Sequence, residues 1–281
     1  MRAGTRAARR PRATSRRWLR PPVLLLGVLV LLAVIGPWIV PHDPVRPDPM
    51  NALVPPSGDH WFGTDHLGMD VFSRVVYATR IDFSLAVIAV TIGGGVGALL
   101  GALAAYRGGL IDTVFLRVVE VIQSFPVFLF GIALFAAFGD GERNLVIVIA
   151  AVNLPLYLRQ VRSALLPLRS AEFVQAARCA GLGPWGVVLR HLLPNARGQI
   201  LSLFALTCAY AIQIIAGLSF IGLGIEPPFP EWGSMINAGG SYIIQGIWWP
   251  SVFPGLAIVL SVYALSGLTD ERLSGGPGGV M

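Results

Sequence analysis

The sequence contains no lysine, and charged residues make up only 13% of its 281 positions. Soluble domains carry about 25% charged residues, so this chain lacks the charge that solvates an ordinary globular enzyme. A disordered chain combines low hydrophobicity with high charge, and the 54% hydrophobic content excludes that class. A polytopic membrane protein is the class that remains.

The absence of lysine has a second consequence. A nucleotide-binding P-loop requires a lysine that reaches the β- and γ-phosphates, so this chain has no such site. All 21 basic residues are arginines, and eight of them stand in the first twenty positions. No basic patch is interleaved with aromatic residues, and we therefore expect no nucleic-acid partner. The two cysteines, Cys179 and Cys208, form no CxxC pair.

Long apolar runs are what the sequence does contain, and a helix needs about 20 apolar residues to cross a bilayer. The third and fourth runs are the weakest, because Arg117 and Glu120 precede one, and Asn153 and Pro155 interrupt the other. We predict an all-α polytopic membrane protein with about six transmembrane helices. The predicted runs are 23–40, 83–106, 121–139, 143–159, 198–223 and 247–268.

The distribution of arginine predicts the orientation, since basic residues favour the cytoplasmic side. With the N-terminus inside, 17 arginines are cytoplasmic and four are external, whereas most acidic residues are external. Both termini are therefore expected in the cytoplasm. The chain then divides into an arginine-rich leader (1–22), a first helix (23–40), an external loop (41–81), a five-helix core (82–272) and a flexible tail (273–281).

Two of the connecting segments are longer than a helical bundle needs, and long loops are often functional. The external loop has an ordered pattern from Gly63 to Arg74, which predicts a turn followed by a short amphipathic helix. The alternative is a solvated connector whose helix is capped by Asp70. His60 and His66 do not have a standard ligand spacing, and we predict no metal site there.

The second long segment is a cytoplasmic loop, 163–197. Ser170 is placed to cap a helix, with Glu172 in its first turn, where the helix dipole favours a carboxylate. Gly181 is suited to the left-handed position that ends this helix. Pro184 suits the start of a second short helix, which Pro194 would close. Two short helices at a bend between membrane spans are typical of a segment that docks into a partner.

Residues 172–195 resemble the EAA loop of permease subunits of binding-protein-dependent ABC importers. The pattern is EAA, three residues, G, nine residues, then I-x-LP. The positions that keep it are Ala176, Ala177, Gly181, Leu193 and Pro194. Gln175 stands where glutamate is usual and His191 where isoleucine is usual. The stretches 63–74 and 216–233 also resemble the C-type permeases of dipeptide, oligopeptide and nickel importers.

The resemblance implies a bacterial plasma-membrane protein whose partners are a second permease, two ATP-binding subunits and an extracytoplasmic substrate-binding protein. ATP and Mg²⁺ would be held by the partner subunits, and this chain would need no cofactor and perform no catalysis. The expected cargo is peptides, with nickel or another small solute as the alternative. The residues expected to contact the ATPase are Glu172, Gln175, Ala176, Ala177, Gly181, Arg190, His191, Leu193 and Pro194. Those expected to face the binding protein are Asp65, Asp70, Glu226, Glu231 and Trp232.

Polar side chains within membrane spans are costly and often mark a transport pathway. Gln123, Asn153 and Gln213 are the candidates, and interhelical hydrogen bonds are the alternative role for each. An ATPase-independent channel is the rival function from another class, although it would not need the docking loop. An intramembrane enzyme is not favoured, because the predicted spans contain no paired carboxylates and no Ser/His or HExxH arrangement.

Overall fold

The computed structural model describes residues 21–139, 141–225 and 227–273. Within these ranges the ordered elements are helices, and the β pairing consists of an isolated bridge between Thr64 and Asp70. The all-α prediction is therefore confirmed. The predicted leader lies outside the described residues except for its last two positions, and the predicted tail lies outside them except for Leu273. Glu226 also lies outside the described residues.

The long helices are α1 (Pro21–Ile39), α2 (Val71–Arg107), α3 (Gly109–Gln123), α4 (Val127–Phe138), α5 (Glu142–Leu165), α8 (Leu193–Phe220) and α10 (Trp249–Leu273). The shorter ones are η2 (Pro49–Asn51), η3 (Pro167–Ser170), α6 (Glu172–Cys179), α7 (Pro184–Val187), η4 (Val188–Leu192), α9 (Trp232–Gly240) and η5 (Ile243–Gln245). Among the described residues, five helical segments are long and apolar enough to cross a membrane, and α3 with α4 makes a sixth if that bent pair is one span.

The third predicted span, 121–139, is not a single straight helix. The chain breaks after Gln123, and α3 and α4 meet at an angle of 93°. Pro126 directly precedes α4 with a ψ of 132°. Proline donates no backbone hydrogen bond and disfavours a helical conformation in the residue before it, which explains why the helix stops here. The prediction missed the break because both halves are apolar.

Helix α2 is longer than the predicted second span. Its 37 residues cover about 55 Å, whereas the hydrocarbon core of a bilayer is about 30 Å thick. The Asp70 carboxylate caps its first turn by accepting a 2.8 Å hydrogen bond from the Ser73 amide. The predicted separate amphipathic helix is thus the first part of α2, and the loop predicted to be external ends at residue 70 instead of 81.

Helices α2 and α5 form the most extensive helix pair in the fold. Glycines of α2 allow this approach: a Cβ atom at Gly97 would lie 2.5 Å from the Leu154 carbonyl oxygen and 2.8 Å from the Tyr157 Cβ. Gly94 faces the Tyr157 ring in the same way. The glycine-rich stretch thus serves close packing, as helix interfaces in membranes commonly do.

The start of α8 differs from the prediction. Instead of ending a second short helix, Pro194 lies in the first turn of α8, and a π-helical turn, η4, connects α8 to α7. The Leu193 amide donates to the Val188 carbonyl, five residues back. A wider turn before a proline accommodates the missing donor and the bulk of its ring. The second short helix is therefore continuous with the membrane-spanning α8.

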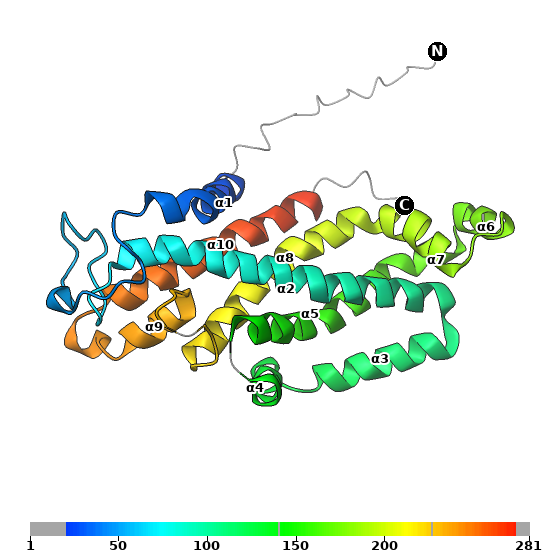
Figure 1. Ribbon diagram of the computed structural model, residues 1–281. Helices are drawn as coiled ribbons and strands as arrows, with labels where there is room; N and C mark the ends of the chain where they lie inside the picture. The colour runs from blue at the N-terminus through cyan, green and yellow to red at the C-terminus, as the bar shows by residue number, and fades with distance from the viewer. Residues whose placement is uncertain (1–20, 140, 226, 274–281) are drawn as a thin grey trace, which may run out of the picture.

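The bundle has two distinct ends (Figure 1). Helices α2, α5, α8 and α10 run alongside one another, and α1 packs on α2 and α10 at one edge. Helices α6 and α7 lie at one end, and the loop 40–70 lies with α9 at the other. Gly267 of α10 lies against Pro22 of α1, so the first turn of α1 adjoins the last turns of α10.

Candidate functional site: a bent helix pair and an apolar cavity

A hydrogen-bonded turn joins α6 to α7. The Gly181 amide donates to the Arg178 carbonyl at 2.9 Å, and the Leu182 amide donates to the Ala177 carbonyl at 3.1 Å. Together with the Gly181 φ of +82°, these bonds form a Schellman motif, which is how many helices end. The predicted left-handed glycine is confirmed. The angle between the two short helices is therefore held by backbone geometry.

The predicted contact residues of α6 separate into two groups. Glu172, Gln175 and Ala176 are exposed, whereas Ala177 is buried against the chain itself. Ala177 is thus unable to provide close approach to a partner, because it already packs beside the buried Val174. Ser170 does not cap α6, since Ala171 takes the N-cap position and no side chain bonds there. The Gln175 amide instead donates to the Ser170 carbonyl at 3.0 Å.

The remaining predicted contact residues lie in η4 and the start of α8. Arg190 and Pro194 are exposed, and His191 and Leu193 are half-buried. The His191 ring lies 6.5 Å from the Phe173 ring, which links η4 to α6. Three large apolar side chains of this region remain at least a third exposed: Phe173, Trp185 and Leu189. An apolar cluster of this kind on an exposed end is typical of an interaction surface.

Sequence reasoning missed two contacts that hold this end of the bundle together. Arg162 of α5 binds the Asp112 carboxylate of α3 through two nitrogens, and its Nη2 lies 2.6 Å from Oδ2. The Arg178 guanidinium lies over the Tyr106 ring, 4.5 Å from its centre, and so joins α6 to the end of α2. The partners are 50 and 72 positions apart, so local spacing carries no signal for either contact.

A cavity of about 640 Å³ lies beside the break between α3 and α4. Its apolar wall comes from α3, α4, α5 and α8, and Gln123 and Gln213 are two of its few polar lining residues. Two of the three predicted pathway residues thus line one cavity. The volume falls within the range of small-molecule sites, which are mostly apolar with a few placed polar groups.

Asn153, the third predicted pathway residue, does not line this cavity. It is fully buried, and its amide donates to the Ile149 carbonyl one turn earlier at 2.8 Å. Its Oδ1 atom has no hydrogen-bond partner within the described part of the chain. Its neighbour Val152 lines the cavity instead. A local bond within α5 therefore fits Asn153 better than a contact with a transported molecule.

Four of the five side chains predicted to face a binding protein lie within the described residues, and all four are buried at the opposite end. Asp65 accepts the amides of Leu67 and Met69, each at 2.9 Å, and forms an ion pair with Arg74 at 3.4 Å. Asp70 caps α2, as described above. Both residues are less than a tenth exposed, so they offer a partner little surface, and their role in this structure is to shape the loop.

Glu231 and Trp232 are also internal. The Glu231 carboxylate caps α9 by accepting the amides of Gly233 and Ser234 at 2.7 and 2.8 Å. Burial raises the pKa of the Glu231 carboxyl, and these amide bonds oppose the increase. The Trp232 indole donates to the Val75 carbonyl at 3.1 Å and so attaches α9 to α2. Both residues are fully buried and cannot contact a binding protein directly.

Comparison with known proteins agrees with this geometry. The sequence model of the family described as "binding-protein-dependent transport system inner membrane component" matches residues 97–275. The chain belongs to this family. It is therefore a multi-pass inner-membrane permease, as the residues from 172 to 195 predicted. The matched segment runs from the middle of α2 through α10 and includes both the bent helix pair and the cavity.

Three curated relatives share most of the permease. The chain is 38% identical to the dipeptide transport system permease protein DppC of Bacillus subtilis over 88% of this chain and 78% of that protein. It is 36% identical to the glutathione transport system permease protein GsiD of Pectobacterium atrosepticum, over 91% and 86%. It is 35% identical to the nickel transport system permease protein NikC of Escherichia coli, over 91% and 92%.

A solved structure supports the fold of the permease. A chain from inward-facing conformations of the MetNI methionine ABC transporter aligns with a TM-score of 0.52 and 20% identity. The alignment covers 73% of this chain and 93% of that chain. The likeness therefore supports the arrangement of the helices.

Proposed function

We propose that this chain is one of two permease subunits of an ATP-driven importer of peptides. The observation that carries this proposal is the exposed, hydrogen-bonded helix pair α6–α7 at one end of a membrane-spanning bundle. The curated relatives named for dipeptides and glutathione support a peptide cargo. The relative named for nickel makes a nickel chelate or another small solute the second candidate.

ATP hydrolysis belongs to separate subunits, because a chain without lysine has no P-loop. The exposed faces of α6, α7 and η4 dock on an ATP-binding subunit. Glu172, Gln175 and Arg190 supply polar contacts there, while Trp185 and Phe173 supply apolar ones. A movement of the docked pair reaches the bundle directly, since α7 continues through η4 into α8. Such rigid coupling suits alternating access between two states.

The proposed orientation places α6–α7, the leader and the tail in the cytoplasm. The contact between Pro22 and Gly267 supports termini on one side, as does the arginine distribution. The loop 40–70 then faces the extracytoplasmic binding protein with surfaces other than Asp65 and Asp70. The cavity beside Gln123 and Gln213 becomes part of the pathway once a second permease is in place.

The test uses the whole complex, with this chain co-expressed with its neighbouring transport subunits. Gly181→Ala forces a side chain into a left-handed conformation, which costs about 1–2 kcal/mol, although no atom lies within 4 Å. That cost reduces the population of the correct turn by about 5- to 30-fold. We expect a comparable loss of ATPase co-purification and of peptide uptake.

Two further variants serve as controls. In Gly198→Ala of α8 the new Cβ also has no atom within 4 Å, but the backbone there is helical. This variant is therefore expected to match the wild type in ATPase co-purification and peptide uptake. Gly181→Asn is expected to recover part of the activity, since asparagine tolerates the left-handed region. Equal activity of Gly181→Ala and Gly198→Ala would contradict the docking role. A stable, transport-active protein without any ATPase would favour the channel instead.

A further inference from the structure

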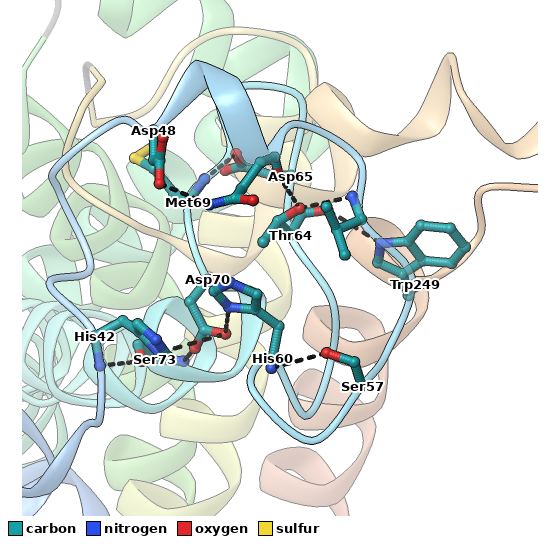
Figure 2. A network of polar contacts seen from close by, with 12 residues as sticks. His42, Asp48, Ser57, His60, Thr64, Asp65, Met69, Asp70, Ser73 and Trp249 are labelled. Carbon is teal, nitrogen blue, oxygen red and sulfur yellow. Dashed lines mark hydrogen bonds and ion pairs between the residues drawn. The ribbon is translucent and has the colours of Figure 1, made fainter.

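Two histidines and an aspartate from separate parts of the external end meet around one carboxylate. His60 Nδ1 lies 2.9 Å from Asp70 Oδ1, and His42 Nδ1 lies 3.9 Å from the same oxygen. The two imidazole rings are 4.6 Å apart, centre to centre. Figure 2 shows this group beside Ser57 and Ser73. His42 follows α1, His60 belongs to the loop, and Asp70 begins α2, so the fold alone brings them together.

We propose that His42, His60 and Asp70 form a binding site for a divalent transition-metal ion of the zinc class. One ligand atom from each residue lies within 4.8 Å of the other two. In a tetrahedral site with bonds of about 2.1 Å, neighbouring ligand atoms are about 3.4 Å apart. The two distances to Asp70 Oδ1 lie on either side of that value. Shifts of about half an ångström would bring both nitrogens to that distance from Asp70 Oδ1.

The electrostatics of Asp70 favour a cation at this point. Asp70 is only 3% exposed, and the ionisable side chains within 4 Å of its carboxylate in the described residues are the two histidines. Arg74, the nearby arginine, is paired with Asp65 instead. Asp70 Oδ2 is occupied by the Ser73 amide, which leaves Oδ1 to face the imidazoles. A metal ion would supply a positive charge that balances this buried carboxylate.

The hydrogen bonds around the site also favour a metal. The buried Nδ1 of His42 has no hydrogen-bond partner in the described part of the chain, although it faces the carboxylate. Buried polar atoms are normally paired, so this nitrogen beside a carboxylate is free to bind an ion. The backbone of His60 is held by Ser57, whose hydroxyl accepts the His60 amide at 3.1 Å. The His42 amide likewise donates to the Ser73 hydroxyl at 3.3 Å, so hydrogen bonds hold the backbone of both histidines.

The chemistry of the ligands selects the class of ion. Imidazole nitrogens suit Zn²⁺, Cu²⁺ and Ni²⁺, whereas Ca²⁺ and Mg²⁺ prefer oxygen ligands throughout. Three protein ligands leave a fourth position for water, and the His42 side chain is 40% exposed to solvent. A bound ion would join the segment after α1 to the first turn of α2. This inference is independent of the proposed transport function, because it needs neither a cargo nor an ATPase.

The test measures Zn²⁺ binding to the full-length permease, purified in detergent with its partner permease and stripped with a chelator. The wild type is expected to bind one Zn²⁺ per chain at this site. His42→Ala and His60→Ala are each expected to weaken binding at least tenfold, since even changes outside the first ligand shell cost 10- to 100-fold. His66→Ala is the matched control, because His66 belongs to the same loop but lies against Tyr242.

Further measurements separate metal binding from misfolding. Size-exclusion profiles identify misfolded variants, and His42→Ala is the safer change because the His42 Nδ1 makes no hydrogen bond within the described residues. Co²⁺ bound to the wild type is expected to give visible absorption of a four-coordinate site, absent in folded His42→Ala. The proposal is overturned if the wild type binds no Zn²⁺ at micromolar concentrations. It is also overturned if His42→Ala and His60→Ala bind as the wild type does.

Discussion

The glycine interface between α2 and α5 allows a sharp test of the fold. In Gly97→Ala, the new Cβ would lie 2.5 Å from the Leu154 carbonyl oxygen, a distance at which backbone must move. Overpacking of this kind costs about 1–3 kcal/mol. Gly95 lies on the same helix, and a Cβ there meets no atom within 4 Å. Both substitutions gain the same helix propensity, about 1 kcal/mol, so the difference between them isolates the packing cost.

The assay heats the permease as a fluorescent fusion in detergent. Size-exclusion chromatography then measures the fraction that remains folded at each temperature. At about 2–4 °C per kcal/mol, Gly97→Ala is expected to melt about 2–12 °C below Gly95→Ala. Gly95→Ala is expected to melt at or slightly above the wild type. If the two variants melt together, α5 does not approach α2 as closely as described, and the packing argument fails.

Three other changes test separate contacts. Trp232→Phe keeps an aromatic side chain but loses the indole hydrogen bond to a main-chain carbonyl of α2 and leaves a cavity, so thermal unfolding should show a loss of at least about 1 kcal/mol; an unchanged midpoint would contradict that bond. In a double-mutant cycle, Asp112→Asn and Arg162→Gln should show a coupling of about 1 kcal/mol in the free energy of unfolding. Additive effects would mean that this ion pair does not hold α3 to α5. Gln213→Leu should lower peptide uptake about 2- to 10-fold with assembly intact, whereas the exposed Gln160→Leu should not; equal uptake would remove Gln213 from the pathway.

The spans were predictable where a helix faces lipid and not where it faces protein. The apolar run used for the second span starts at Phe83, but α2 begins twelve residues earlier, at Val71. Arg74 and Asp82 interrupt the run in sequence, yet both are buried within the protein. Hydropathy measures the cost of placing a residue in lipid, so it shortens any helix whose polar residues are buried among protein neighbours.

Within the candidate site, features that depend on neighbouring positions in the sequence were predictable, whereas features that depend on distant positions were not. Gly181 was predictable because a left-handed helix end is a local property of the chain. The burial of Asp65, Glu231 and Trp232 was not, because loop residues are expected to be exposed until their partners are known. His42 was missed as a neighbour of Asp70 because 28 positions separate them.

The π-helical turn η4 changes the direction in which side chains of α7 point relative to those of α8. A π turn contains one residue more than an α turn, and each residue advances a helix by about 100°. The face that α7 presents at the end of the bundle is therefore rotated by about that angle from the face it would present on an uninterrupted helix. A single-residue deletion within 188–192 would reverse this rotation. Arg190 and His191 would then turn toward a different side of the molecule, with the spans themselves unchanged.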